Sequence, residues 1–388
     1  MVTVVEDSGY ARAPELDRIT ELESAWAEPS AGARLRAVRA AAEPLRARVA
    51  EGPRALCLRS LPIATLAHPT RFAFHGAALS PAPFVVLTHR ATLVQFLQRG
   101  EPKTLLFNPT DDVAARATPC FERLIRQFGD YLAFQVLQHR YATLERQLAA
   151  FGLGADDIDY LAFGNLQHQD LRPLLGTSDG AFAARFSRAR LLASRSEWED
   201  WDDLHPEQRF WYVADGKRGV DRSRVVLVDG DLELGGGALL LATPGATSGN
   251  RTLFVNTADG LWGISNNGVA ADSWSPLDSR IKGLATASRR LDIDVLPSSA
   301  SPERGADQYT SMILERTLTD RVRRAPAFSQ LFPSSEVTPS RLSPGLRPTV
   351  VHGNLAYGKV VEGAGAAEAS RVSRARALAG VATSAPRP

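Results

Sequence analysis

Residues 156–170 have the sequence DDIDYLAFGNLQHQD, and this stretch decides the fold. A helix is expected to end near Gly152, and the apolar run 160–163 that follows it is typical of a buried strand. From Gly164 onward the side chains become polar, so the strand is expected to open into a polar loop. Because loop side chains two positions apart can point into one cleft, this loop is a candidate functional site.

Three further segments with strand-like runs follow in order along the chain. Residues 189–201 have the sequence ARLLASRSEWEDW, and residues 225–231 have the sequence VVLVDGD. Residues 239–250 have the sequence LLLATPGATSGN and are followed by the apolar run 252–255. The apolar runs are expected to form strands, and the Gly, Pro, Ser and Asp residues beside them are typical of turns.

Together these four segments resemble the metallo-β-lactamase-fold superfamily, in particular its lactonase-like branch. In that family the first loop has the pattern His-x-His-x-Asp-His, and the later strand and turn have the pattern Thr-Pro-Gly-His-Thr-x-Gly-His. The resemblance covers roughly residues 60 to 300 and implies an α/β fold, a four-layer αββα sandwich. It also implies a hydrolase site in which histidines and carboxylates hold one or two divalent cations that activate water.

The histidines of the family pattern are exchanged in this chain. In one register of the first loop, His168 and Asp170 keep the positions of the second histidine and the aspartate. That register leaves Leu166 and Leu171 at the remaining two positions, and leucine side chains cannot bind a metal.

In the other register, which we favour, Asn165 and Gln167 replace the two histidines of His-x-His. Asparagine and glutamine keep roughly the reach and hydrogen bonding of imidazole but are poor ligands for zinc. In the later segment Ala246 and Asn250 stand at histidine positions, and Asn266 lies where the family has an acidic bridging ligand. The sequence therefore predicts a degenerate metal site, and neither a metal nor another cofactor is expected.

An alternative interpretation keeps a single, weakly bound zinc ion. Its ligands would come from His168, Asp170 and His352, the last of which follows a predicted strand at 349–351. Asp170 is equally well explained as the N-cap of a helix that begins at Leu171. The remaining histidines are interpreted as ordinary surface or core residues: His68, His75, His89, His139 and His205.

Composition limits the classes of partner. The chain has 388 residues, of which 44% are hydrophobic and 23% charged, values typical of a soluble globular protein. Its 45 Lys and Arg residues against 43 Asp and Glu residues give a net charge of +2, too balanced to predict nucleic-acid binding. No apolar run has the length of a membrane span and no signal-peptide pattern is present, so we expect a cytoplasmic protein without membrane association. Cys57 and Cys120 lack the spacing of a metal site.

We expect three regions: a helical N-terminal extension over 1–55, a metallo-β-lactamase-like domain over 56–361 and a flexible tail over 362–388. Within the domain, a long amphipathic helix over 120–151 is predicted to cover one sheet face. The favoured function is that of a pseudoenzyme with an eroded metal site, which binds a small molecule or a protein partner in the cleft. The alternative function is a hydrolase of lactone or ester type with a reduced or atypical metal site. The oligomeric state is not predicted.

Overall fold

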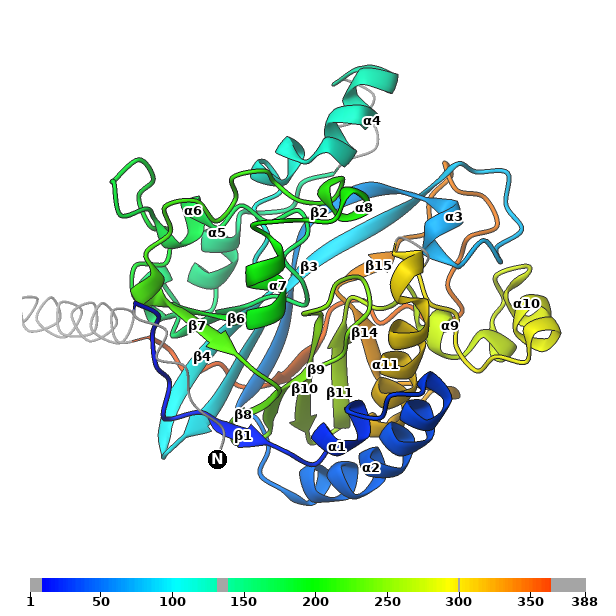
Figure 1. Ribbon diagram of the computed structural model, residues 1–388, viewed down its shortest axis with the longest axis horizontal. Helices are drawn as coiled ribbons and strands as arrows, with labels where there is room; N and C mark the ends of the chain where they lie inside the picture. Colours follow the sequence, from blue (N-terminus) through cyan, green and yellow to red (C-terminus); the bar gives the residue numbers. More distant parts are fainter. Residues whose placement is uncertain (1–8, 131–138, 299–300, 364–388) are drawn as a thin grey trace, which may run out of the picture.

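The computed structural model describes residues 9–130, 139–298 and 301–363, and two β-sheets that pack face to face form its centre (Figure 1). Among the described residues the first sheet has six strands, in the order β1 (Asp17–Ile19), β8 (Asp231–Gly235), β9 (Ala238–Ala242), β10 (Arg251–Thr257), β11 (Gly260–Ser265) and β14 (Leu331–Pro333). The second sheet has the order β16 (Ala356–Gly358), β2 (Cys57–Pro69), β3 (Phe84–Gln98), β4 (Glu101–Phe107), β5 (Tyr160–Ala162), β6 (Arg190–Ser194) and β7 (Val225–Val228). In addition, β15 (Ser335–Val337) pairs with β3, and β12 (Arg321–Val322) pairs with β13 (Ala325–Ser329).

Helices surround the sheets and connect their strands. The α-helices are α1 (Glu23–Trp26), α2 (Ala31–Glu51), α3 (Thr70–Ala73), α4 (Pro119–Asp130), α5 (Leu144–Ala149), α6 (Arg172–Leu175), α7 (Arg195–Asp200), α8 (Pro206–Arg209), α9 (Ala271–Trp274), α10 (Leu284–Leu291) and α11 (Gly305–Leu318). Short 3₁₀ turns are η1 (Ala114–Ala117), η3 (Ala155–Asp157), η4 (Arg222–Arg224), η5 (Pro276–Asp278) and η6 (Pro302–Arg304). In the described part of the chain, none of these helices has both the length and the hydropathy that a lipid bilayer would require of a spanning segment.

The main core lies between the two sheets. Phe96 and Phe107 of the second sheet pack in one buried cluster with Leu240 and Val255 of the first sheet. Fully burying one such side chain contributes about 1.5–3 kcal/mol to the free energy of unfolding, so this layer holds the two sheets together.

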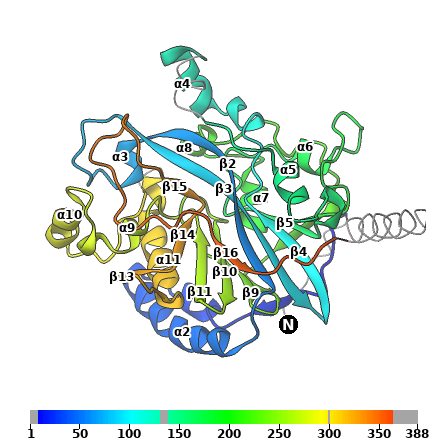
Figure 2. The same ribbon diagram turned by 180° about the vertical axis from the view of Figure 1, so that it is seen from behind.

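Helices cover the outer face of each sheet. On the first sheet, Leu45 of α2 and Leu314 of α11 pack with Phe254 of β10. On the second sheet, Leu148 of α5 and Trp198 of α7 belong to the cluster that covers its outer face. The resulting order is helix, sheet, sheet, helix (Figures 1 and 2), so the predicted four-layer αββα fold is confirmed.

The N-terminal segment takes part in the sandwich. Residues 17–19 form β1, which pairs antiparallel with β8 at the edge of the first sheet. Helix α2, which contains Pro44 and runs on to Glu51, lies along the outer face with α11. Residues 1–8 of the expected N-terminal extension and residues 364–388 of the expected tail lie outside the described residues.

The predicted continuous helix over 120–151 is wrong. Helix α4 ends at Asp130, where Gly129 already has the positive φ of 77°, and α5 begins only at Leu144 after Thr143 caps it. Helix α4 projects away from the sandwich in Figure 1, whereas α5 lies on the second sheet. A glycine with positive φ is incompatible with a continuing helix, so the apolar spacing alone did not determine the helix length.

The strand order brings the loops of interest to one end of the sandwich. Strands β4, β5, β6 and β7 run parallel to one another, so their carboxyl ends share one edge of the sheet. Residue Asn108 follows β4, and the polar loop 164–170 follows β5. In open α/β sheets this edge is where ligands bind.

Candidate functional site

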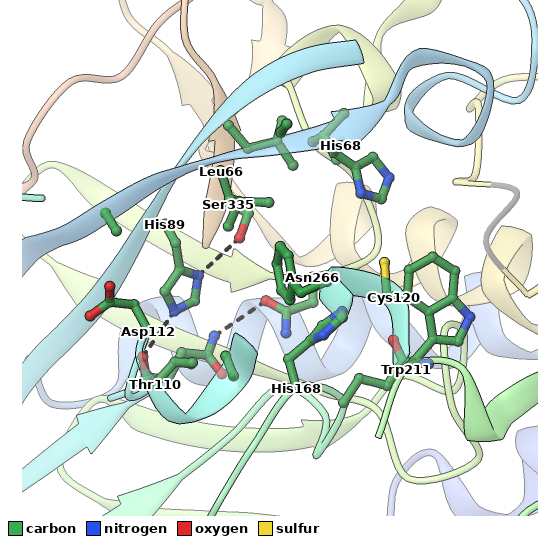
Figure 3. Close-up of a pocket in the computed structure, with 18 of the residues that line it drawn as sticks. Leu66, His68, His89, Thr110, Asp112, Cys120, His168, Trp211, Asn266 and Ser335 are labelled. Carbon is green, nitrogen blue, oxygen red and sulfur yellow. Dashed lines mark hydrogen bonds between the residues drawn. The ribbon is translucent and has the colours of Figure 1, made fainter. Parts of the chain in front are cut away.

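A cavity of about 190 Å³ lies at this end of the sandwich (Figure 3). It is enclosed by the C-terminal half of β2, the N-terminal part of β3, the start of α4 and the loops that follow β4, β5, β9 and β11. Its apolar wall consists of Leu66, Leu87, Cys120, Phe121, Leu124, Trp211 and Val269. Its polar lining includes His68, His89, Asn108, Thr110, Asn165, Gln167, His168, Gln169 and Asn266.

Most of the residues singled out from the sequence lie at this cavity. Among its lining residues are the five predicted candidates Asn165, Gln167, His168, Ala246 and Asn266. By contrast, the leucines of the rival register, Leu166 and Leu171, are buried in the hydrophobic core beneath the helices of the second sheet.

The amides at the predicted histidine positions bond to one another and to the backbone. The Nδ2 atom of Asn165 donates to Oδ1 of Asn250 at 3.0 Å, and Nδ2 of Asn250 donates to the carbonyl oxygen of Thr243 at 2.9 Å. The Nε2 atom of Gln167 donates to Oε1 of Gln208 at 3.2 Å and to the carbonyl oxygen of Ala246 at 3.4 Å. Asn250 is therefore a buried partner of the lining residue Asn165, behind the cavity wall.

Asn266 is held against the end of β5 by a close approach. The Nδ2 atom of Asn108 donates to Oδ1 of Asn266 at 3.2 Å, and Oδ1 of Asn108 accepts from the backbone N–H of Gly164 at 2.8 Å. A Cβ atom at position 164 would lie 2.5 Å from Nδ2 of Asn266, so only glycine leaves room for this amide.

Asp170 does not line the cavity. Its carboxylate accepts from Nε and Nη2 of Arg172 at 2.9 Å and 2.7 Å, and from the backbone N–H of the same residue at 3.1 Å. The carboxylate therefore closes a turn at the start of α6. Asp170 is not the N-cap that the sequence left open, because α6 begins at Arg172 and Leu171 is its N-cap; Asp170 instead forms a local turn one residue earlier.

His352 lines a different cavity at another edge of the sandwich. Its ring packs between Trp262 and Phe332, at centroid distances of 5.4 Å and 5.9 Å. The ligand set His168, Asp170 and His352 of the single-zinc alternative is therefore not brought together at the first cavity.

Two histidines that the sequence analysis assigned to ordinary positions, His68 and His89, also line the first cavity (Figure 3). The Nε2 atom of His89 lies 3.3 Å from the carbonyl oxygen of Asn108, and Nδ1 lies 2.9 Å from Oγ of Ser335. Since a carbonyl oxygen only accepts, Nε2 carries the proton and Ser335 donates to Nδ1. Strand length is the sequence signal that could have located these histidines at the cavity. Strands β2 and β3 have 13 and 15 residues, so they are longer than most strands and extend to the site.

Burial keeps the three lining histidines uncharged. It lowers the pKa of His68 and of His89 to about 4, and that of His168 to about 3. The Nδ1 atom of His168 lies 3.2 Å from Oγ1 of Thr118, and its ring meets that of Trp211 edge-on at 5.7 Å. At neutral pH the cavity therefore presents neutral imidazoles, which donate or accept hydrogen bonds without a charge.

A buried carboxyl group supports the polar loop from below. Glu197 of α7 accepts from the backbone N–H of Leu166 at 2.8 Å and from the hydroxyl of Tyr212 at 2.6 Å. Burial raises the pKa of Glu197 to about 7, although these hydrogen bonds oppose the shift. The sequence analysis quoted Glu197 within a segment that resembles the family, but it assigned no function to this residue.

The donor set does not fit a resident divalent cation. A catalytic zinc ion takes three protein ligands from His, Cys, Asp or Glu. Among the described residues no group of three such side chains is arranged to hold a metal ion. Both ring nitrogens of His89 have protein partners, and the amides Asn165 and Gln167 direct N–H groups at neighbouring oxygens.

Comparisons with known proteins find similarity in structure only. No protein-family model matches the chain, and no curated protein matches it in sequence. Among solved structures, the dizinc quorum-quenching lactonase AidC is 12% identical with a TM-score of 0.46, over 81% of this chain and 100% of that one. A probable metal-dependent hydrolase from Staphylococcus aureus is 14% identical with a TM-score of 0.44, over 58% of this chain and 78% of that one. A quorum-quenching N-acyl homoserine lactone lactonase is 18% identical with a TM-score of 0.40, over 62% and 88%.

Matches with identities of 12% to 18% and TM-scores of 0.40 to 0.46 carry no conclusion about the activity of this chain. Its own layers and strand order, described above, form the four-layer sandwich that the resemblance implied. A further solved structure with similarity to this chain is a hydrolase of the beta lactamase superfamily, 16% identical with a TM-score of 0.37, over 66% of this chain and 84% of that one.

Proposed function

We propose that this chain binds a small molecule in the first cavity without a tightly bound metal ion, and that it hydrolyses esters and lactones weakly or not at all. The observation that supports this proposal most directly is the pairing of the amides at the expected ligand positions. Asn165 bonds to Asn250, and Gln167 bonds to Gln208 and the backbone of Ala246. Such pairs keep the cleft polar while leaving few lone pairs for a cation.

The lining indicates the chemistry of the ligand. Gln169 is buried, and its Nε2 donates to Oγ1 of Thr110 and to the carbonyl oxygen of Gln167, both at 3.0 Å. Because the carbonyl oxygen only accepts, this contact fixes which end of the amide is nitrogen. The Oε1 atom of Gln169 is then a buried acceptor without a partner. A ligand with an O–H or N–H group would satisfy it.

The rest of the lining favours a ligand whose buried part is uncharged and largely apolar. The wall formed by Leu66, Leu87 and Val269 offers hydrocarbon contacts, and the lining histidines are neutral at pH 7. Burying a charge beside such groups costs free energy. The two charged residues of the lining, Asp112 and Arg116, are both partly exposed, and Asp112 is paired with Arg140 at 2.6 Å. We therefore infer an apolar molecule with one hydroxyl or amide group.

The test combines metal content with turnover and binding. Protein purified from zinc-supplemented cells is analysed for zinc, iron and manganese, and its activity on lactones and esters is measured with and without a chelator. We expect well under one equivalent of metal and rates near background. Binding of neutral hydroxyl-bearing fragments is then followed by ligand-observed NMR, and Gln169→Leu should weaken that binding. One or two metals per chain with chelator-sensitive turnover would refute the proposal.

One observation favours the alternative, a hydrolase with an atypical metal site. His68, His89 and His168 line the same cavity and are neutral, as metal-binding imidazoles must be, although within the described residues the three are not arranged as a metal site. If these residues hold a metal, His68→Ala should abolish both the bound metal and the turnover. If the cavity binds a ligand only, the same variant should change ligand binding and leave the metal content low.

A further inference from the structure

A second cavity, of about 380 Å³, lies where the edges of the two sheets meet. Leu58 of β2 and Tyr357 of β16 line it from the second sheet, and Trp262 of β11 lines it from the first. Strand β16 is the edge strand of the second sheet, and β11 lies next to β14, the edge strand of the first sheet. This cavity shares no lining residue with the first cavity, so it can bind a ligand of its own.

Aromatic side chains form part of its wall. Trp262 and Tyr357 are both partly exposed, and the ring of His352 meets the Trp262 ring edge-on at 5.4 Å. Partly exposed aromatic rings that line a cavity favour a flat, aromatic ligand, because offset or edge-on ring contacts add to the burial of apolar surface.

The cavity also carries a positive charge. Arg323 and Arg324 both line it and are exposed, and Asp259 is the acidic residue of the lining, so the two arginines outnumber it. Arg323 is 3.4 Å from the carboxylate of Asp259, whereas Arg324 forms no salt bridge among the described residues and donates to the carbonyl oxygen of Val351 at 2.6 Å.

The carboxylate of Glu336 does not neutralise Arg324. Its pKa responds to the charge of Arg324, but Glu336 is buried and paired with Arg90 at 3.3 Å. The guanidinium of Arg324 is thus available to an anion, and a planar carboxylate matches its geometry.

Two buried polar atoms of the lining residues have no partner. The Nε2 atom of Gln330 donates to the carbonyl oxygen of Asp259 at 2.8 Å, which fixes the orientation of the amide and leaves Oε1 as an unpartnered acceptor. The Nε2 atom of His352 is likewise buried without a partner, while the backbone of Leu331 also interacts with this imidazole. Buried polar groups without partners are rare, and those of a cavity wall point to a bound molecule.

We propose that this second cavity binds a small aromatic carboxylate with a hydroxyl group on its ring. The carboxylate pairs with Arg324, the ring packs against Trp262 and Tyr357, and the hydroxyl group hydrogen-bonds to Gln330 or His352. This site is independent of the function proposed for the first cavity, and it gives His352 a role that the predicted metal cleft did not.

The first test uses the full chain and three related probes in calorimetry or ligand-observed NMR. 4-Hydroxybenzoate carries every feature that the site requires, 4-hydroxybenzamide lacks the charge, and 4-methoxybenzoate lacks the hydroxyl donor. We expect one 4-hydroxybenzoate per chain, and binding that is weaker by about tenfold or more for each of the other two probes. Equal binding of all three probes, or no binding of 4-hydroxybenzoate at millimolar concentration, would overturn the proposal.

The second test uses variants. Arg324→Gln and Trp262→Leu should each weaken 4-hydroxybenzoate binding by about tenfold or more. Arg324→Lys should retain only part of the wild-type affinity, since lysine cannot make a bidentate contact with a carboxylate. Arg347→Gln is the matched control, because Arg347 is an exposed arginine outside this cavity. Equal losses in Arg324→Gln and Arg347→Gln would indicate a general charge effect and contradict the site, as would complete displacement of the probe by an equal concentration of inorganic phosphate.

Discussion

The amide cluster of the first cavity allows a direct test of how the loops converge. The triple variant Asn165→His, Gln167→His and Ala246→His places three imidazoles on residues that line one cavity. The positions are close, because Nε2 of Gln167 lies 3.4 Å from the carbonyl oxygen of Ala246. Three imidazoles with an open fourth position form the arrangement of a catalytic zinc centre.

The expected change in the free energy of unfolding is the sum of two opposing contributions. Without metal, the variant loses the hydrogen bond from Asn165 to Asn250 and leaves the buried Oδ1 of Asn250 unpaired, which costs about 1–3 kcal/mol. With free zinc at a hundred times its dissociation constant, binding adds about 2.7 kcal/mol to the free energy of unfolding. The unfolding entropy is about 2.1 cal/mol/K per residue, so for 388 residues this gain raises the Tm by about 3 °C.

The assay is thermal unfolding as a function of free zinc, with zinc content measured in parallel. The control is the triple variant Leu166→His, Leu171→His and Ala246→His, which introduces two of its imidazoles into the hydrophobic core. The control should be destabilised and should gain nothing from zinc. Zinc-dependent stabilisation of the control alone, or of neither variant, would refute the convergence of Asn165, Gln167 and Ala246 on one cleft.

Three further predictions concern the surroundings of the first cavity. Burial raises the pKa of Glu197 from its ordinary value of 4.5 to about 7. The contribution of Glu197 to the free energy of unfolding is therefore complete below pH 4.5 and is lost as the pH rises through 7. Chemical denaturation at several pH values should show that Glu197→Gln removes about 3 kcal/mol of this pH dependence. Gly164→Ala should displace Asn266, destabilise the fold by about 1–3 kcal/mol and weaken ligand binding, as measured by denaturation and NMR. Asp170→Ala should cost about 1–2 kcal/mol through the lost turn and ion pair with Arg172, while ligand binding stays unchanged; loss of metal-dependent turnover in this variant would instead support the hydrolase.

The resemblance predicted the sandwich, and local patterns predicted its strands and the loops that follow them. The apolar runs at 160–163, 225–228 and 239–242 coincide closely with β5, β7 and β9, and each is followed by a turn. Asn165 and Gln167 follow one of these strands directly, so their place at the strand end was predictable from the chain alone.

The place of the histidines beside the cavities could not be predicted from the sequence, because it depends on contacts between distant segments. His68 and His89 lie on long, paired strands, and whether such side chains face a cavity depends on the loops that cross over them. The same limit applies to His352, which Trp262 and Phe332 hold at another edge. Residue type and spacing do not contain this information.

The cavity is held open by carboxylates that take no part in its lining. Glu315 of α11 is fully buried, and its Oε1 accepts from Thr252, Ser265 and Asn267, which lie at or next to the ends of β10 and β11. Glu197 does the same for the loop after β5 through the backbone N–H of Leu166. Burial raises the pKa of both carboxyl groups, which reflects the cost of removing them from water. Their hydrogen bonds nevertheless hold the neighbouring segments in place. Loops fixed in this way need no cation to keep their shape, so the cleft is a preformed cavity, as the function proposed above requires.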